Sequence, residues 1–161
     1  MKKSAEFLVK NLTGMEIEGT NTISVRYKTL VNFAKIFGIT DPKYVGPEED
    51  GIIACHAFAN HYVIKSMYRM LAGAKIEKNG QMVDPIKKFG KVLHAGQVYN
   101  FEGCVDIKPG DKLTISAKFG KVWLIEDSMI LYTELIMPVK NQNNEFVCKA
   151  TINAAIRPGG Y

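Results

Sequence analysis

Apolar residues recur every three or four positions in three stretches of the chain, and this period predicts three helices. Two are short, over residues 4–13 with Ser4 as the N-cap, and over residues 30–37. The strongest pattern covers residues 56–71 and is followed by Gly73. Its apolar positions are Phe58, Val63, Ile64, Met67, Met70 and Leu71. We therefore expect this segment to be the central helix of the core.

The second half of the chain alternates apolar and polar residues, which predicts β-strands. Expected connections are a turn at 109–111 and polar segments at 119–127 and 141–144, while residues 75–88 are expected to form a mobile loop. A long helix packed on an antiparallel sheet gives an α+β architecture. The expected strands cover residues 22–27, 98–105, 113–117, 129–137 and 146–156.

The size of the chain predicts a single domain over residues 1–161, with its core at about 14–158. A chain of 161 residues with 47% hydrophobic content buries about 70% of its surface in one core. Its three cysteines are far apart and lack ligand spacing, which argues against a disulfide framework and a metal site and favours a cytoplasmic protein. No apolar run approaches the ~18 residues of a membrane span.

The net charge of +5 and pI near 9.0 raise the alternative of nucleic-acid binding. Basic residues are scattered, however, and the only cluster beyond the N-terminus is Lys87, Lys88 and Lys91. No basic stripe interleaved with aromatic residues accompanies them. Nucleic-acid binding therefore rests on charge alone, and a solvated basic face explains the same residues.

Two sets of residues in the chain form recognisable motifs. Residues 38–44 read Gly-Ile-Thr-Asp-Pro-Lys-Tyr and lead to Ile-Ala-Cys-His-Ala-Phe at 53–58. Residues 93–97 read Leu-His-Ala-Gly-Gln, and residues 108–111 read Lys-Pro-Gly-Asp. In this order the motifs resemble the N-terminal, FAS1-like dehydratase branch of the MaoC-like family. The resemblance covers about residues 14–158 and implies a single hot-dog domain, an antiparallel sheet wrapped around a long central helix.

The same resemblance implies that the usual catalytic pair is replaced. Active MaoC-like relatives carry an Asp and a His in this loop, within the pattern Gly-Asp-x-Asn-Pro-Leu-His. The corresponding positions here are Ile39 and Tyr44. Isoleucine exchanges no proton, and tyrosine is a poor base at neutral pH although it donates hydrogen bonds. Acid–base catalysis by these two positions is therefore not expected.

The resemblance implies that the thioester-binding part of the site is retained. The donor to the thioester oxygen would be a backbone N–H at the start of the central helix, where His56 and Ala57 lie. The lysine cluster of Lys87, Lys88 and Lys91 would then bind the phosphates of a coenzyme A thioester. No cofactor is implied, because the acyl group is carried by coenzyme A or an acyl carrier protein.

Three side chains are candidates to replace the missing pair: Asp41, His56 and Tyr44. Asp41 precedes Pro42, where aspartate commonly accepts a hydrogen bond from the backbone of its own turn. His56 at the helix start either faces the cleft or serves as a helix-capping or interface residue. Cys55 adjoins His56, but adjacent side chains point in different directions, so a buried thiol is the alternative to a nucleophile.

These observations lead to three hypotheses. In the first, the chain is the non-catalytic, acyl-binding subunit of an (R)-3-hydroxyacyl dehydratase or enoyl-CoA hydratase, in an edge-to-edge homodimer or heterodimer with a catalytic hot-dog subunit. In the second, it is an active hydratase or thioester enzyme that uses displaced groups such as Asp41 or His56. In the third, it binds nucleic acid. Only the first explains Ile39 and Tyr44 together with the retained frame.

Overall fold

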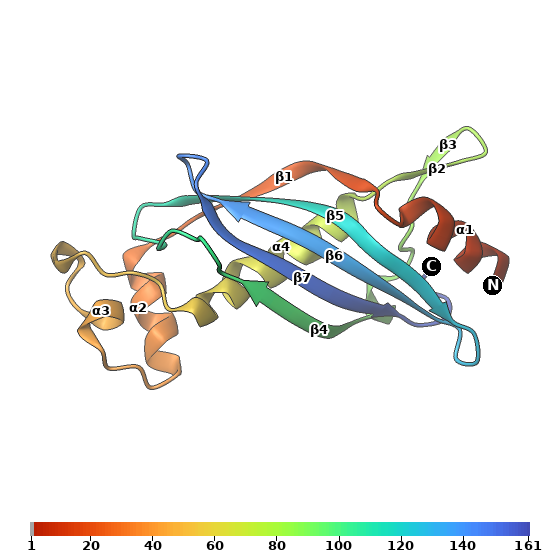
Figure 1. Ribbon diagram of the computed structural model, residues 1–161. Coiled ribbons are helices and arrows are strands. Elements are labelled where there is room, and N and C mark those ends of the chain that lie inside the picture. Colours follow the sequence, from red (N-terminus) through yellow and green to blue (C-terminus); the bar gives the residue numbers. More distant parts are fainter. Residues whose placement is uncertain (1) are drawn as a thin grey trace.

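The computed structural model describes residues 2–161, and its centre is one long helix packed on a five-stranded antiparallel sheet (Figure 1). The helix is α4 (Ala59–Gly73). The strand order is β1-β5-β6-β7-β4, so β1 and β4 are the two edges. The strands are β1 (Glu16–Ser24), β4 (Val92–Asn100), β5 (Lys112–Ile125), β6 (Ile130–Lys140) and β7 (Phe146–Ile156). The predicted α+β architecture is confirmed.

The core lies between α4 and the sheet face that it covers. Strand β6 alternates strictly between buried and half-buried residues, which places Leu131, Leu135 and Met137 on the covered face with no exposed surface. From the helix side, Val63 and Met67 are equally buried. Each such side chain contributes about 1.5–3 kcal/mol by leaving water. This interface therefore fixes α4 on the sheet.

Smaller elements cover the two ends of this core (Figure 1). Helices α2 and α3 lie beyond the start of α4, whereas α1, the β2–β3 hairpin and the C-terminus lie at the opposite end (Figure 1). No helix within residues 2–161 is long and apolar enough to cross a membrane. These elements are α1 (Lys2–Leu12), α2 (Tyr27–Ile36), α3 (Pro42–Val45), β2 (Ile76–Lys78) and β3 (Gln81–Val83), with 3-10 turns η1 (Glu48–Asp50), η2 (His56–Phe58) and η3 (Phe89–Lys91).

Several predicted boundaries in the first half were wrong, including the start of the central helix: residues 56–58 form η2, and α4 begins at Ala59. Helix α1 begins at Lys2, so Ser4 lies inside the helix and is not its cap. The strand predicted at 22–27 is β1, which begins six residues earlier and ends at Ser24. Its alternation is hidden because the register with β5 shifts between Ile17 and Asn21. Tyr27, placed at the end of that strand, instead begins α2.

The expected connections in the second half also differ. Most of the segment 119–127 belongs to β5, which remains paired with β6 up to Ile125 despite a register shift after Phe119. The strand predicted at 98–105 ends at Asn100, and a loop with Gly103 at φ 71° follows. The expected loop at 75–88 contains the β2–β3 hairpin, whose turn residues Asn79 and Gly80 both have positive φ. Such a turn matches the twist of two paired strands.

Candidate functional site

The chain enters α4 through a 3-10 turn that leaves two backbone donors free. Cys55 is extended at φ −70° and ψ 151°, and η2 then begins at His56. The Phe58 N–H donates to the Cys55 carbonyl over 2.9 Å. Within residues 2–161, no hydrogen bond engages the N–H of His56 or Ala57. Free N–H groups at a helix start carry partial positive charge, so this turn can bind a carbonyl or carboxylate oxygen.

The His56 side chain covers this turn by stacking on an aromatic ring from another element. Its ring lies 4.3 Å from the ring of Phe101, with the planes 8° apart. Phe101 is half-buried in the loop after β4, whereas His56 is exposed. The predicted capping role is not seen, because no side chain caps η2. The imidazole therefore lies at the mouth of the site.

A small cavity of about 20 Å³ lies beneath the stacked pair. Its buried wall is Tyr62, which has no exposed surface and whose hydroxyl lies 3.4 Å from the thiol sulfur of Cys148. Burial raises the pKa of the Tyr62 phenol and of the Cys148 thiol, so both are neutral at physiological pH. Other residues that line the cavity include Ala54, Cys55, Ala59, Cys104 and Val147.

A polar cluster joins the first turn of α4 to the edge strand β4. The side-chain amide of Gln97 donates to Asn60 Oδ1 over 2.6 Å, and the Tyr99 hydroxyl donates to the same oxygen over 3.0 Å. Burial raises the pKa of Tyr99 to about 12. The cluster therefore holds neutral donors and acceptors between the helix start and the sheet edge.

The loop that carries the predicted catalytic positions is built as a turn. Asp41 is the N-cap of α3 and accepts a hydrogen bond of 2.9 Å from the Lys43 N–H, with Pro42 as the first helical residue. The Asp41 carboxylate thus accepts a hydrogen bond from the backbone of its own turn, which the sequence analysis gave as the alternative to a catalytic role. Ile39 and Tyr44 are half-buried. Among residues 2–161, no hydrogen bond connects this loop to His56.

The predicted lysines lie far from the start of α4. Lys87 donates its N–H to the Gly160 carbonyl over 2.8 Å, and the Lys91 carbonyl accepts from Arg157 over 2.9 Å. This is the C-terminal end of the molecule, where β4 begins (Figure 1). Nine residues of β4 span about 30 Å at about 3.4 Å per residue. One subunit therefore does not bring Lys87, Lys88 and Lys91 together with His56 and Ala57.

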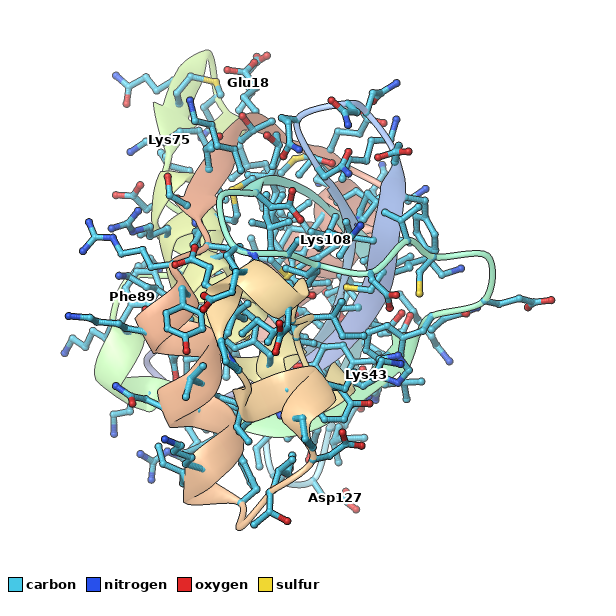
Figure 2. The ribbon with its side chains drawn as sticks, turned by 90° about the vertical axis from the view of Figure 1, so that its left-hand side faces the viewer. Glu18, Lys43, Lys75, Phe89, Lys108 and Asp127 are labelled. Carbon is cyan, nitrogen blue, oxygen red and sulfur yellow. The ribbon has the colours of Figure 1, made fainter. Side chains whose placement is uncertain are left out.

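Two other lysines lie at the same end as the start of α4. The Lys43 carbonyl accepts from the Ile53 N–H over 3.0 Å, and the Ala54 N–H donates to Ile107, the neighbour of Lys108, over 2.8 Å. Both lysines are visible in the view onto this end of the molecule (Figure 2). Lys108 directly follows Ile107, which lines the cavity, and Lys43 is bonded through its carbonyl to Ile53, the neighbour of the lining residue Ala54. Because lysines are scattered along the sequence, no sequence pattern singled out Lys43 or Lys108.

A larger hollow of about 570 Å³ lies on the opposite face of the sheet, where the register of β1 shifts. It is lined by both acidic and basic residues, among them Glu16, Glu18, Lys118 and Lys149. None of the motif residues contributes to it. Within residues 2–161, no group of three or more His, Cys, Asp or Glu side chains is arranged to hold a metal ion. The candidate site is therefore the start of α4.

Comparisons with known proteins agree with the fold. Residues 11–150 match the model of the FAS1-like dehydratase domain region. A search of curated proteins finds no significant match. Solved structures with 12–17% identity share the fold and thereby confirm the predicted hot-dog arrangement.

Three of these structures are similar over almost their whole length. The HadBC (3R-hydroxyacyl-ACP dehydratase) complex from Mycobacterium tuberculosis has 16% identity and a TM-score of 0.61, over 89% of this chain and 97% of that chain. The ChsH1-ChsH2 complex from the same organism has 12% identity and a TM-score of 0.60, over 90% and 98%. A MaoC-like dehydratase from Rhodospirillum rubrum has 17% identity and a TM-score of 0.59, over 90% and 92%.

Proposed function

The chain belongs to the family of FAS1-like dehydratase domain regions, and from this premise we propose that it is an acyl-thioester-binding subunit that works beside a catalytic hot-dog subunit. The observation that carries the proposal is the pair of free N–H groups at His56 and Ala57. It is supported by Ile39 and Tyr44, which stand where the resemblance implies the catalytic Asp and His. The reaction would be dehydration of an (R)-3-hydroxyacyl thioester or hydration of an enoyl thioester.

This chemistry divides into two parts. Water addition to an enoyl thioester needs a base, an acid, and donors for the enolate oxygen that develops on the carbonyl. In the proposal, the N–H groups of His56 and Ala57 bind the carbonyl oxygen of a thioester held by this chain. The partner supplies the aspartate and histidine for proton transfer.

The edge strand β4 is the proposed contact with the partner. Its outer side is unpaired in the sheet, and it carries Val98 and Leu93, which are 66% and 46% exposed. An open edge with exposed apolar side chains favours pairing with another strand. Similar chains occur in two complexes, HadBC and ChsH1-ChsH2. A second copy of this chain would use the same edge in a homodimer.

Edge pairing would also bring the lysines that precede β4 close to the site of the partner subunit. In an antiparallel pair, the beginning of one strand lies beside the end of the other. Lys87, Lys88 and Lys91 of this chain would then lie near the helix start of the partner. In the proposal they bind the phosphates of a coenzyme A thioester held there, while Lys43 and Lys108 lie at this chain's own site.

The second candidate function is an active hydratase that uses His56. It is favoured by the exposed imidazole at the mouth of the site. Asp41 contributes little to this alternative, because its carboxylate accepts the cap hydrogen bond of α3. An assay of crotonyl-CoA hydration with the chain alone separates the two functions. We expect turnover near the detection limit, since each missing acid–base group removes about 10²–10⁴-fold in rate. Robust activity that is lost in His56→Ala would establish the alternative.

The binding role is tested by removing one N–H group. His56→Pro deletes the backbone donor at the first position of η2, where proline is tolerated, and Cys55 already has the extended conformation that precedes proline. His56→Ala is the control, because it removes the imidazole and keeps the N–H. Loss of one hydrogen bond of about 1 kcal/mol should weaken crotonyl-CoA binding about fivefold in His56→Pro. Equal affinity of the two variants in calorimetry would contradict the assigned donor.

A further inference from the structure

An open groove of about 260 Å³ lies between α2 and the first turns of α4, at the end of the molecule that holds the candidate site (Figure 1). Its base is aromatic, because the Phe33 ring lies 5.4 Å from the ring of buried Phe58 and 6.2 Å from that of His61. Phe58 also closes the η2 turn through its N–H, so the groove adjoins the free N–H groups of His56 and Ala57. The groove is lined by Lys28, Thr29, Asn32, Phe33, Ile36 and His61.

Two adjacent apolar side chains are exposed to solvent at the end of α2. Ile36 is 78% exposed and Phe37 is 59% exposed. Among residues 2–161, no other large apolar side chain is more exposed than Ile36. The Phe37 ring lies 5.1 Å from that of Phe33, so the exposed pair continues the aromatic base of the groove. Contiguous exposed apolar surface of this kind marks a site where another molecule binds.

The surface around the groove carries positive charge and no negative charge of its own. Residues 19–40 and 51–76, which include α2 and α4, contain no aspartate or glutamate. Their exposed lysines are Lys28, Lys35 and Lys65. In the part of the chain that the structure describes, none of these three forms an ion pair. A partner with complementary charge is therefore acidic.

The surroundings of the groove favour a protein helix over a larger anionic surface. The exposed carboxylates of η1, Glu48, Glu49 and Asp50, follow α3, which lies beside α2 at this end of the molecule (Figure 1). A flat membrane or a nucleic-acid duplex would meet these carboxylates and be repelled. The apolar lining also needs an apolar side chain, which a phosphate backbone does not offer. An amphipathic helix that lays an apolar side chain into a groove, with carboxylates beside it, satisfies both conditions.

We propose that this groove docks an acidic helix of the carrier protein to which the acyl group is attached as a thioester. The apolar side chain of that helix would cover Ile36 and Phe37, and its carboxylates would face Lys28 and Lys35. The proposal rests on the proposed function, because the docked protein delivers the thioester whose carbonyl oxygen binds beside the groove. It decides between the two carriers that the sequence left open, and crotonyl-CoA then binds without the contacts of the helix.

The test compares crotonyl-CoA with the same crotonyl group on the phosphopantetheine arm of a purified acyl carrier protein, by calorimetry. Wild-type chain should bind the crotonyl carrier protein at least about tenfold more tightly than crotonyl-CoA, with a difference that shrinks as salt is added. Ile36→Glu and Lys35→Glu should each weaken carrier binding at least about tenfold, because they place a carboxylate opposite an acidic helix. Lys10→Glu is the matched control, since it makes the same charge change on α1 at the opposite end of the molecule.

Affinity for crotonyl-CoA separates loss of docking from loss of the site. It should change less than about twofold in Ile36→Glu and Lys35→Glu, because both side chains are exposed and lie outside the thioester site. A carrier protein that binds no more tightly than crotonyl-CoA overturns the proposal, and so does carrier binding that both variants leave unchanged. Binding of phosphatidylglycerol vesicles or duplex DNA that the same variants abolish would also overturn it. If neither crotonyl thioester binds more tightly than free coenzyme A or the unacylated carrier protein, the proposed function itself is refuted.

Discussion

A lysine placed on the exposed edge strand should prevent dimerisation of the chain. Val98 on β4 is 66% exposed, and full burial of a valine contributes about 1.5 kcal/mol. Burying the exposed two-thirds in an edge-to-edge dimer therefore contributes about 1 kcal/mol per subunit, or about 2 kcal/mol per dimer. Val98→Lys should weaken the dimer at least about 30-fold, since 1.4 kcal/mol corresponds to a factor of about ten. The cost of desolvating two ammonium groups adds to this value.

Analytical ultracentrifugation over micromolar concentrations measures the effect. Wild-type chain should sediment as a dimer and Val98→Lys as a monomer. Thr22→Lys is the matched control, because Thr22 is an exposed residue on β1, the opposite edge of the same sheet. The same charge on that edge should leave the dimer intact. A wild-type chain that is monomeric alone and with a catalytic partner would refute the edge-pairing model, and so would a dimer that only Thr22→Lys disrupts.

Three further outcomes are expected. Asn21→Ala should lower the free energy of unfolding in urea by about 1–3 kcal/mol, because Asn21 donates to buried Ser66 over 2.7 Å and accepts from Arg69 over 2.9 Å; a change below 0.5 kcal/mol would contradict this. Stability should fall above about pH 10, since folding raises the pKa of Tyr62 and that of Tyr99, the latter to about 12. Below about pH 10 both phenols are protonated in the folded and in the unfolded state, so their ionisation does not change stability there. A free energy of unfolding that stays constant up to about pH 11 would argue against their burial. Crotonyl-CoA affinity should decrease with added salt because the phosphate contacts are electrostatic, and a salt-independent affinity would exclude lysine–phosphate binding.

The central helix was predictable because its signal is local. Four of the six apolar residues at helical spacing, Val63, Met67, Met70 and Leu71, lie on the buried face of α4. Strand limits depend on the partner strand instead. Segment 119–127 is polar enough to suggest a connection, yet β6 supplies hydrogen-bond partners as far as Ile125, so β5 continues. Pairing between distant segments outweighs local polarity there.

In the candidate site, too, features that depend on neighbouring residues were predictable, and features that depend on distant residues were not. The turn role of Asp41 was offered by the sequence because it depends on the next two residues only. The Tyr62–Cys148 hydrogen bond joins residues 86 positions apart, and the stacking of His56 on Phe101 joins a helix to a distant loop. No local pattern encodes either contact. The lysines next to β4 formed a clear cluster in sequence, but their distance from His56 follows only from the direction of that strand.

A binding subunit can lose catalysis and keep its site because the two parts reside in different chemical groups. Proton transfer depends on side chains, and an isoleucine side chain such as that of Ile39 exchanges no proton. The N–H groups of His56 and Ala57 belong to the backbone, and they remain free for any non-proline residue as long as the 3-10 turn forms. The turn is held in place by the Phe58 N–H, which donates to the Cys55 carbonyl, and by packing of the Phe58 ring in the core. A backbone site of this kind can therefore bind an oxygen atom whatever side chains stand at positions 39 and 44.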